Sequence, residues 1–168
     1  MVKGLKQSSS VVAIGFSVAE SAANTFTQGS VDLNLSPLDR EVFVVLAINL
    51  DSDFPEMISG TNTRFRAGVS TTSQTAMPSL SDSNCLARIT EAIRSDAVNA
   101  VAFTSAALET PPSTLDYIGI VATNDFFVQT QGTGNTAIGG VSGKLYGYRA
   151  VADASIYAAL VQSEVLSA

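Results

Sequence analysis

The chain has 168 residues, of which 46% are hydrophobic and 14% are charged, and its formal net charge is −6. This length and apolar content suit one globular domain with its own core. The sequence contains no His, no Trp and a single Cys, which excludes Ser-His-Asp catalysis, Cys-His catalysis and ordinary zinc sites. We therefore expect no enzyme activity and no cofactor. Cys85 must be either a free thiol or a link between chains.

Short apolar or alternating runs separated by turn residues dominate the chain, which predicts an all-β domain. In residues 10–18 and 27–35, apolar positions alternate with small or polar ones, as in strands with one buried face. Residues 42–50 are apolar on both faces, and their β-branched content favours a central strand over a helix. Further strands are expected at residues 64–70, 98–104, 115–123, 126–131 and 144–151.

One short helix is expected in a mid-chain connection, from Asp82 to Ser95. Within it, Leu86, Ile89 and Ile93 repeat at helical spacing, and the serine and aspartate before them can cap its start. The segment Ala154–Val165 allows a helix or a last strand, and the alternation within it favours the strand. The strand count predicts a two-sheet antiparallel sandwich of the jelly-roll or immunoglobulin type, in one domain spanning residues 10–168, and we favour the jelly-roll type.

The densest acidic cluster, formed by Asp51, Asp53 and Glu56, follows a core strand. Its oxygen atoms are weak candidates for Ca²⁺ ligands, and the simpler interpretation is a solvated acidic turn. Residues 132–137 match the glycine spacing of a dinucleotide-binding loop, but the glycines that follow cannot open a helix. We therefore predict a flexible hairpin loop there and no metal or cofactor site.

Several residues are candidates for contacts between subunits. Arg64 and Arg66 lie two residues apart, hence on one face of a strand, where they could pair with acids of this chain or of a neighbour. Of the adjacent Phe126 and Phe127, one must point outward from a half-buried strand. The first nine residues form a weakly basic extended arm. The candidate assembly contacts are Lys3, Lys6, Arg64, Arg66, Phe126 and Phe127.

The order of these elements resembles that of single jelly-roll capsid proteins of icosahedral viruses, with an N-terminal arm over residues 1–9, eight strands and a short mid-chain helix. The strand containing Tyr146–Ala150, after a glycine-rich turn, is also similar to virion proteins. The resemblance implies a structural protein of the virion that self-assembles into a shell through arm and loop contacts. Its implied partners are copies of itself, other virion proteins, and possible minor capsid proteins or an internal membrane.

This chain lacks the strongly basic arm of capsid proteins that package RNA directly, so we expect no direct sequence-specific binding of nucleic acid. A decoration or turret protein would have a similar sequence. The alternative function is a β-sandwich adhesion or binding module, or an extracellular fibre subunit, that recognises glycan or protein through residues 51–83. No apolar run reaches the length of a membrane span, and no continuous hydrophobic segment predicts a signal peptide.

Overall fold

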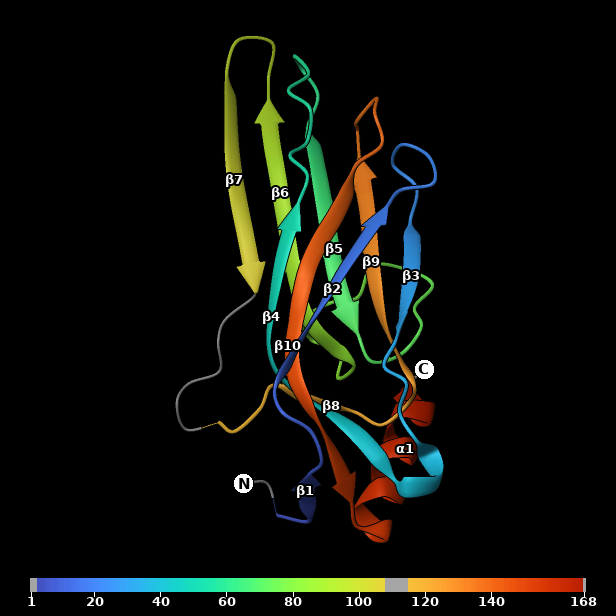
Figure 1. Cartoon of the computed structure of the whole chain (residues 1–168). Coiled ribbons are helices and arrows are strands. Elements are labelled where there is room, and N and C mark those ends of the chain that lie inside the picture. The colour runs from blue at the N-terminus through green and yellow to red at the C-terminus, as the bar shows by residue number, and fades with distance from the viewer. Residues whose placement is uncertain (1–2, 108–114, 168) are drawn as a thin grey trace.

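The computed structural model describes residues 3–107 and 115–167, and it consists of two antiparallel β-sheets and one α-helix (Figure 1). The first sheet contains β1 (Leu5–Gln7), β2 (Val12–Ala19), β4 (Glu41–Ser52), β8 (Gly119–Val121) and β10 (Gly140–Ala152). The second sheet contains β3 (Thr27–Asp32), β5 (Thr63–Ser70), β6 (Cys85–Ser95), β7 (Ala100–Ala107) and β9 (Asp125–Thr133). The predicted all-β sandwich is therefore confirmed, and the strand expected at residues 115–123 is reduced to the three residues of β8.

The strand pairing follows a jelly-roll topology. If β1 and β7 are set aside, eight strands remain, and they pair first with eighth, second with seventh, third with sixth, and fourth with fifth. This pattern arises when a long hairpin of paired strands wraps into two facing sheets. β1 and β7 are additions at the edges, since β1 pairs with the far end of β10 and β7 pairs with β6.

The main core lies between the two sheets. Phe43, Leu145 and Phe126 are almost completely buried there, and the Phe126 ring packs edge-to-face against Phe16 with 5.7 Å between centroids. Such large apolar side chains supply most of the free energy that opposes the loss of chain entropy on folding. The core makes the sandwich a rigid support for the loops at its ends.

A second apolar cluster explains why β4 is apolar on both faces. Val42 and Val44 point away from the main core, where they pack against α1 (Ala154–Ser167) through Ile156 and Leu160. Figure 1 shows this helix beside the end of the sandwich where β10 finishes. One end of the first sheet is therefore covered on both sides, whereas the described residues cover the other end on its inner side alone.

The predicted mid-chain helix is wrong, because Cys85–Ser95 forms strand β6, paired with both β5 and β7. The residues that fit a helical spacing also fit an alternation. Ala87 and Ile89 face the core, while Arg88 and Thr90 face outward. The pairing with two neighbouring strands decides between the two patterns, since it satisfies the backbone along the whole segment.

The predicted last strand is also wrong, because Ala154–Ser167 forms an α-helix. Ile156, Tyr157, Leu160 and Val161 recur at helical spacing and all pack into the second apolar cluster. The helix begins with a hydrogen bond from the Tyr157 nitrogen to the carbonyl of the residue four positions earlier, at 2.9 Å.

The N-terminal segment is partly built into the sandwich. Leu5–Gln7 pair with residues 150–152 of β10, and the Leu5 side chain is buried in the second apolar cluster. Lys3 and Lys6 remain exposed. An arm that reaches a neighbouring subunit would first have to release these strand pairs.

Candidate functional site

Four connections gather at the same end of the sandwich, at the top of Figure 1. They join β2 to β3, β4 to β5, β6 to β7, and β9 to β10. We call this region the loop end, defined as residues 20–26, 53–62, 96–99 and 134–139. The wrapped topology brings these segments together although they are far apart in the sequence.

A buried carboxylate fixes one side of the loop end. Glu20 is only 3% exposed, and its two oxygen atoms accept hydrogen bonds from the backbone nitrogens of Gly132, at 2.6 Å, and Gly139, at 3.1 Å. These bonds tie the start of one loop to both sides of another. A buried carboxylate with such partners is stabilising because its lone pairs and the backbone donors are satisfied together.

Asn135 joins three of the four loops. Asn24 and Asn135 exchange hydrogen bonds between side chain and backbone at 2.7 and 2.9 Å. The Asn135 amide also accepts from the Glu56 nitrogen and donates to the Arg64 carbonyl, both at 3.1 Å. The fourth loop is attached by a 3.2 Å bond from the Gly60 nitrogen to the carbonyl of residue 96. The connection predicted to be a flexible hairpin is thus held from several sides.

The three acidic candidates do not assemble into a cation site. Asp53 accepts a hydrogen bond from the Gly140 nitrogen at 2.8 Å, and Glu56 accepts from the nitrogens of Thr136 and Ala137. These backbone bonds lower the pKa of Glu56 below its ordinary value. Asp51 lies exposed on β4. Within residues 3–107 and 115–167, no three His, Cys, Asp or Glu side chains are grouped as metal ligands would be.

The loop end exposes large apolar side chains. Phe54 is 75% exposed, Met57 67%, Val98 87% and Ile138 59%. They come from three of the four tied loops. Apolar side chains held out in water on a fixed support are typical of a protein contact surface.

Within residues 3–107 and 115–167, the outer edge of β7 pairs with no other strand, which makes it a second exposed feature. Its eight residues are uncharged and contain no proline, and Val101 and Phe103 are exposed. Natural sheets usually protect such an edge with charges, proline or a bulge, because its unpaired backbone groups can pair with another strand. The register of β6 with β7 shows no bulge.

The predicted arginine pair lies on the outer face of β5. Arg64 Nε donates to the Thr133 hydroxyl at 3.4 Å, and Arg66 Nη2 donates to the Gln131 side-chain oxygen at 2.8 Å. Both of these partners are neutral side chains of β9. Arg88 and Arg94 are not part of the predicted pair, because the sequence pattern predicts a helix at their positions.

The two adjacent phenylalanines differ in their surroundings. Phe126 is completely buried, which removes it from the candidate contacts. Phe127 is half-buried and lines a hollow of about 210 Å³ beside Thr71 and Val165. Phe127 therefore borders an open hollow between the β5–β6 connection and the end of α1.

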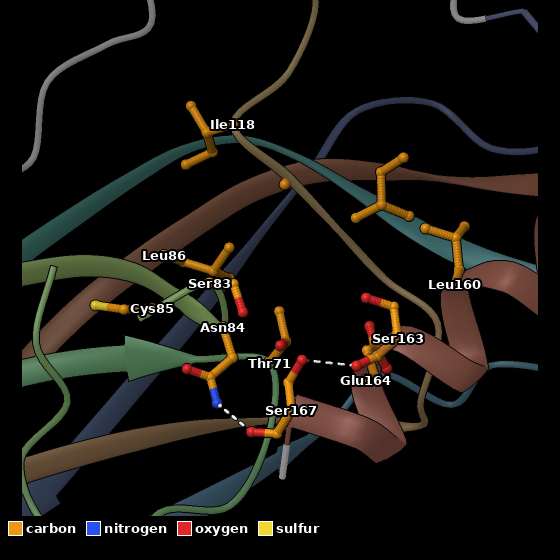
Figure 2. Close-up of a pocket in the computed structure, with 12 residues that line it drawn as sticks. Thr71, Ser83, Asn84, Cys85, Leu86, Ile118, Leu160, Ser163, Glu164 and Ser167 are labelled. Carbon is orange, nitrogen blue, oxygen red and sulfur yellow. Dashed lines mark hydrogen bonds between the residues drawn. The ribbon is translucent and has the colours of Figure 1, made fainter. Parts of the chain in front are cut away.

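A small cavity of about 160 Å³ lies where α1 meets β8 and the start of β6 (Figure 2). Asn84 Nδ2 donates to the Ser167 carbonyl at 3.2 Å across it, and Cys85 and Glu164 are its ionisable lining residues. Burial raises the pKa of the half-buried Cys85 thiol, which makes the thiol less reactive. The residues that line the cavity do not place a nucleophile next to a base. We therefore interpret the cavity as a gap in the contact between α1 and the strands on which it packs.

The described residues include no helix with the length and apolar character required to cross a bilayer.

No family model matches the chain, and no curated protein matches it. Among solved structures, the chain is similar to one from Desmodium yellow mottle tymovirus, at 13% sequence identity and a TM-score of 0.28. The match covers 87% of this chain and 85% of that chain. Because the TM-score is so low, the fold assignment rests on the strand pairing alone.

Proposed function

We propose that this protein is a structural component of a virus particle, and that copies of it associate through the loop end. The observation that favours this role is the set of apolar side chains, Phe54, Met57, Val98 and Ile138, carried by loops that hydrogen bonds tie together. A shell subunit needs a rigid body with contact surfaces that are formed before assembly. The jelly-roll sandwich and its tied loops have both properties.

Preformed loops favour association for an energetic reason. A contact made by flexible loops loses conformational entropy on binding, whereas loops already fixed by Glu20 and Asn135 lose little. Burying an exposed side chain such as Phe54 then contributes apolar stabilisation at about 25 cal/mol per Å². Sparse charge also suits this role, since protein interfaces are depleted of Lys, Asp and Glu.

Light scattering coupled to size exclusion, with negative-stain imaging of the large species, tests this function. The wild-type chain should form particles or rings well above the 17.4 kDa monomer. The double variant Phe54→Ser/Met57→Ser should shift the population to monomer, with unchanged circular dichroism. Leu38→Ser is the matched control, because Leu38 is 96% exposed on the β3–β4 connection, outside the loop end.

Two results would count against the proposal. One is a wild-type chain that stays monomeric at every concentration. The other is equal assembly of wild type and the double variant. A stable monomer that binds glycan or Ca²⁺ would favour the alternative, a β-sandwich binding module, and a monomer that binds only to a virus surface would favour a decoration protein.

A further inference from the structure

Four arginines follow one another along the outer face of β5 and β6. Cross-strand partners share a face, and so do residues two apart on one strand. In register order, the arginines and their opposite residues are Arg88 with Gly68, Arg66 with Thr90, Arg64 with Ala92, and Arg94 with Val101. Outward-facing positions recur at every second residue along a strand, about 7 Å apart, and we call the positions that lie side by side on neighbouring strands a level. Each successive level of β5 and β6 holds one arginine. We call these four residues the arginine row.

The positions that surround the arginine row are neutral. On the β5 side of the row, the outward-facing residues of the neighbouring strand β9 are Gln129, Gln131 and Thr133. On the β6 side, the outward-facing residues of the neighbouring strand β7 are Ser105, Phe103 and Val101. The row thus concentrates four of the nine Lys and Arg residues of a chain whose net charge is −6. This segregation is not explained by ion pairing on the sheet.

Arg66 lies close to other positive charges of the row, and in the part of the chain that the structure describes no anionic side chain is bonded to it. Its Nε atom is buried and has no hydrogen-bond partner among the described residues, while its Nη2 atom is bonded to Gln131. Burial and the neighbouring charges of Arg64 and Arg88 lower its pKa. Like charges held this close repel one another, and an anion placed over them would relieve this repulsion.

A groove lies over one end of the row. It encloses about 330 Å³ and is lined by Asn62, Arg64, Thr90, Arg94, Phe103 and Thr133. Arg94 stacks over the Phe103 ring, with 5.7 Å from its guanidinium carbon to the centroid, and Phe103 remains 43% exposed. The groove adjoins a second hollow of about 460 Å³ that shares the residues Asn62, Arg94 and Phe103.

One carboxylate, that of Asp96 at the β6–β7 turn, lines the adjoining hollow. Its Oδ1 atom accepts hydrogen bonds from the backbone nitrogens of Val98, at 2.8 Å, and Asn99, at 2.6 Å. Those bonds hold the pKa of Asp96 below its ordinary value and fix its position in the turn. The hydrogen bonds of Asp96 are therefore directed into the turn.

We infer that the arginine row is a binding site for the phosphodiester backbone of single-stranded nucleic acid, without selection for base sequence. Evenly spaced charges along a line match a linear polyanion of regular charge. A stacked strand spaces its phosphates about 3.4 Å along the axis, and a strand with splayed bases spaces them further apart, closer to the arginine spacing. Phe103 supplies a ring on which a base can stack, the combination used by proteins that bind single strands non-specifically.

A nucleic acid fits these observations better than an acidic protein surface does. The charges of an acidic patch on a folded partner are not expected to recur at the regular spacing of the arginines. Such a patch would also make no use of the exposed ring of Phe103. The inference does not depend on the proposed assembly, because the four arginines belong to one chain and lie outside the loop end.

Fluorescence anisotropy with a labelled 20-nucleotide oligo(dT), titrated at several salt concentrations, tests the site. Four phosphate contacts predict a slope of log K against log salt of about −3, at about 0.7 per contact. Arg64→Gln/Arg94→Gln should reduce the slope by about half, and both side chains are exposed, so folding should be unaffected. Arg64→Lys/Arg94→Lys should retain most of the slope.

The matched control is Arg40→Gln/Lys144→Gln, which changes the net charge equally at two exposed positions outside the second sheet. The control should bind as wild type does. Absence of wild-type binding at low salt, or an equal loss in the control, would overturn the inference. Binding of polyglutamate but not of oligo(dT) would also overturn it, in favour of an acidic protein partner.

Discussion

The Glu164 carboxylate, near the C-terminal end of α1, lies 2.8 Å from the backbone nitrogen of Ala122 and accepts its hydrogen bond. The other carboxylate oxygen accepts from the Thr123 nitrogen at 2.9 Å. Glu164 is 7% exposed, so one buried side chain fastens the last helix to the segment between β8 and β9. That contact fixes the far end of the molecule, opposite the loop end, by the same means that Glu20 uses: a carboxylate that accepts two backbone hydrogen bonds.

Removal of the Glu164 carboxylate should weaken this attachment. Glu164→Leu replaces the carboxylate with an apolar side chain of similar volume and leaves the Ala122 and Thr123 nitrogens without an acceptor. We expect the free energy of unfolding to fall by about 1–3 kcal/mol, the cost of stranding a buried donor. Urea denaturation should show a lower midpoint with an unchanged slope, while the exposed Gln162→Ala control stays within about 0.5 kcal/mol of wild type.

Glu164 and Glu56 should affect the pH dependence of stability with opposite signs. Burial raises the pKa of Glu164, so its contribution is fully present below the unfolded pKa near 4.5 and is lost as pH rises through the folded value. Backbone hydrogen bonds from residue 136 lower the pKa of Glu56, so its contribution is present above about 4.5 and is lost as pH falls.

Denaturation of wild type, Glu164→Gln and Glu56→Gln between pH 3 and pH 8 measures both effects. The stability difference between wild type and Glu164→Gln should shrink as pH rises, and the difference between wild type and Glu56→Gln should grow. Parallel curves for all three proteins would show that neither carboxylate has a shifted pKa.

Two strand glycines should respond oppositely to alanine. A Cβ atom at Gly147 would collide with the Val44 carbonyl and the Phe43 ring, whereas at Gly15 it would meet no atom within 4 Å. Gly147→Ala should destabilise the protein by about 1–3 kcal/mol, as overpacking does. Gly15→Ala should be neutral or stabilise it by up to about 1 kcal/mol. Thermal denaturation of the two variants distinguishes these outcomes, and similar melting temperatures would contradict the close approach of β4 and β10.

Individual strands of the sandwich could be predicted from the sequence where their hydrophobic pattern fits a strand alone. The doubly apolar run that became β4 indicated a strand covered on both sides, and α1 is the second cover. β6 was missed because its apolar residues fit both a helix and a strand, and only pairing with β5 and β7 separates the two. That error also concealed the arginine row, since Arg88 and Arg94 join Arg64 and Arg66 only when β6 is a strand.

The loop end could not be predicted for a different reason. Asp53 and Glu56 were correctly recognised as a local acidic group, but their hydrogen-bond partners lie about 80 positions later, at Gly140 and Thr136. Glu20 gave no signal, because its partners at residues 132 and 139 are remote as well. Contacts of such long range arise from the topology and are invisible to local spacing.

The edge of β7 gives a test of association that leaves the fold intact. The bond from the Asp96 nitrogen to the Asn99 carbonyl identifies these two residues as a hydrogen-bonded pair, and such pairs alternate along an antiparallel ladder. The N–H groups of Val101 and Phe103 therefore point toward β6, and that of Ala102 points outward. Ala102→Pro should therefore remove an edge donor without breaking the ladder, whereas Phe103→Pro should remove a ladder hydrogen bond and lower stability by about 1–3 kcal/mol. If copies pair through this edge, Ala102→Pro will reduce the assembled fraction in light scattering at an unchanged denaturation midpoint. An unchanged assembled fraction would restrict association to the loop end.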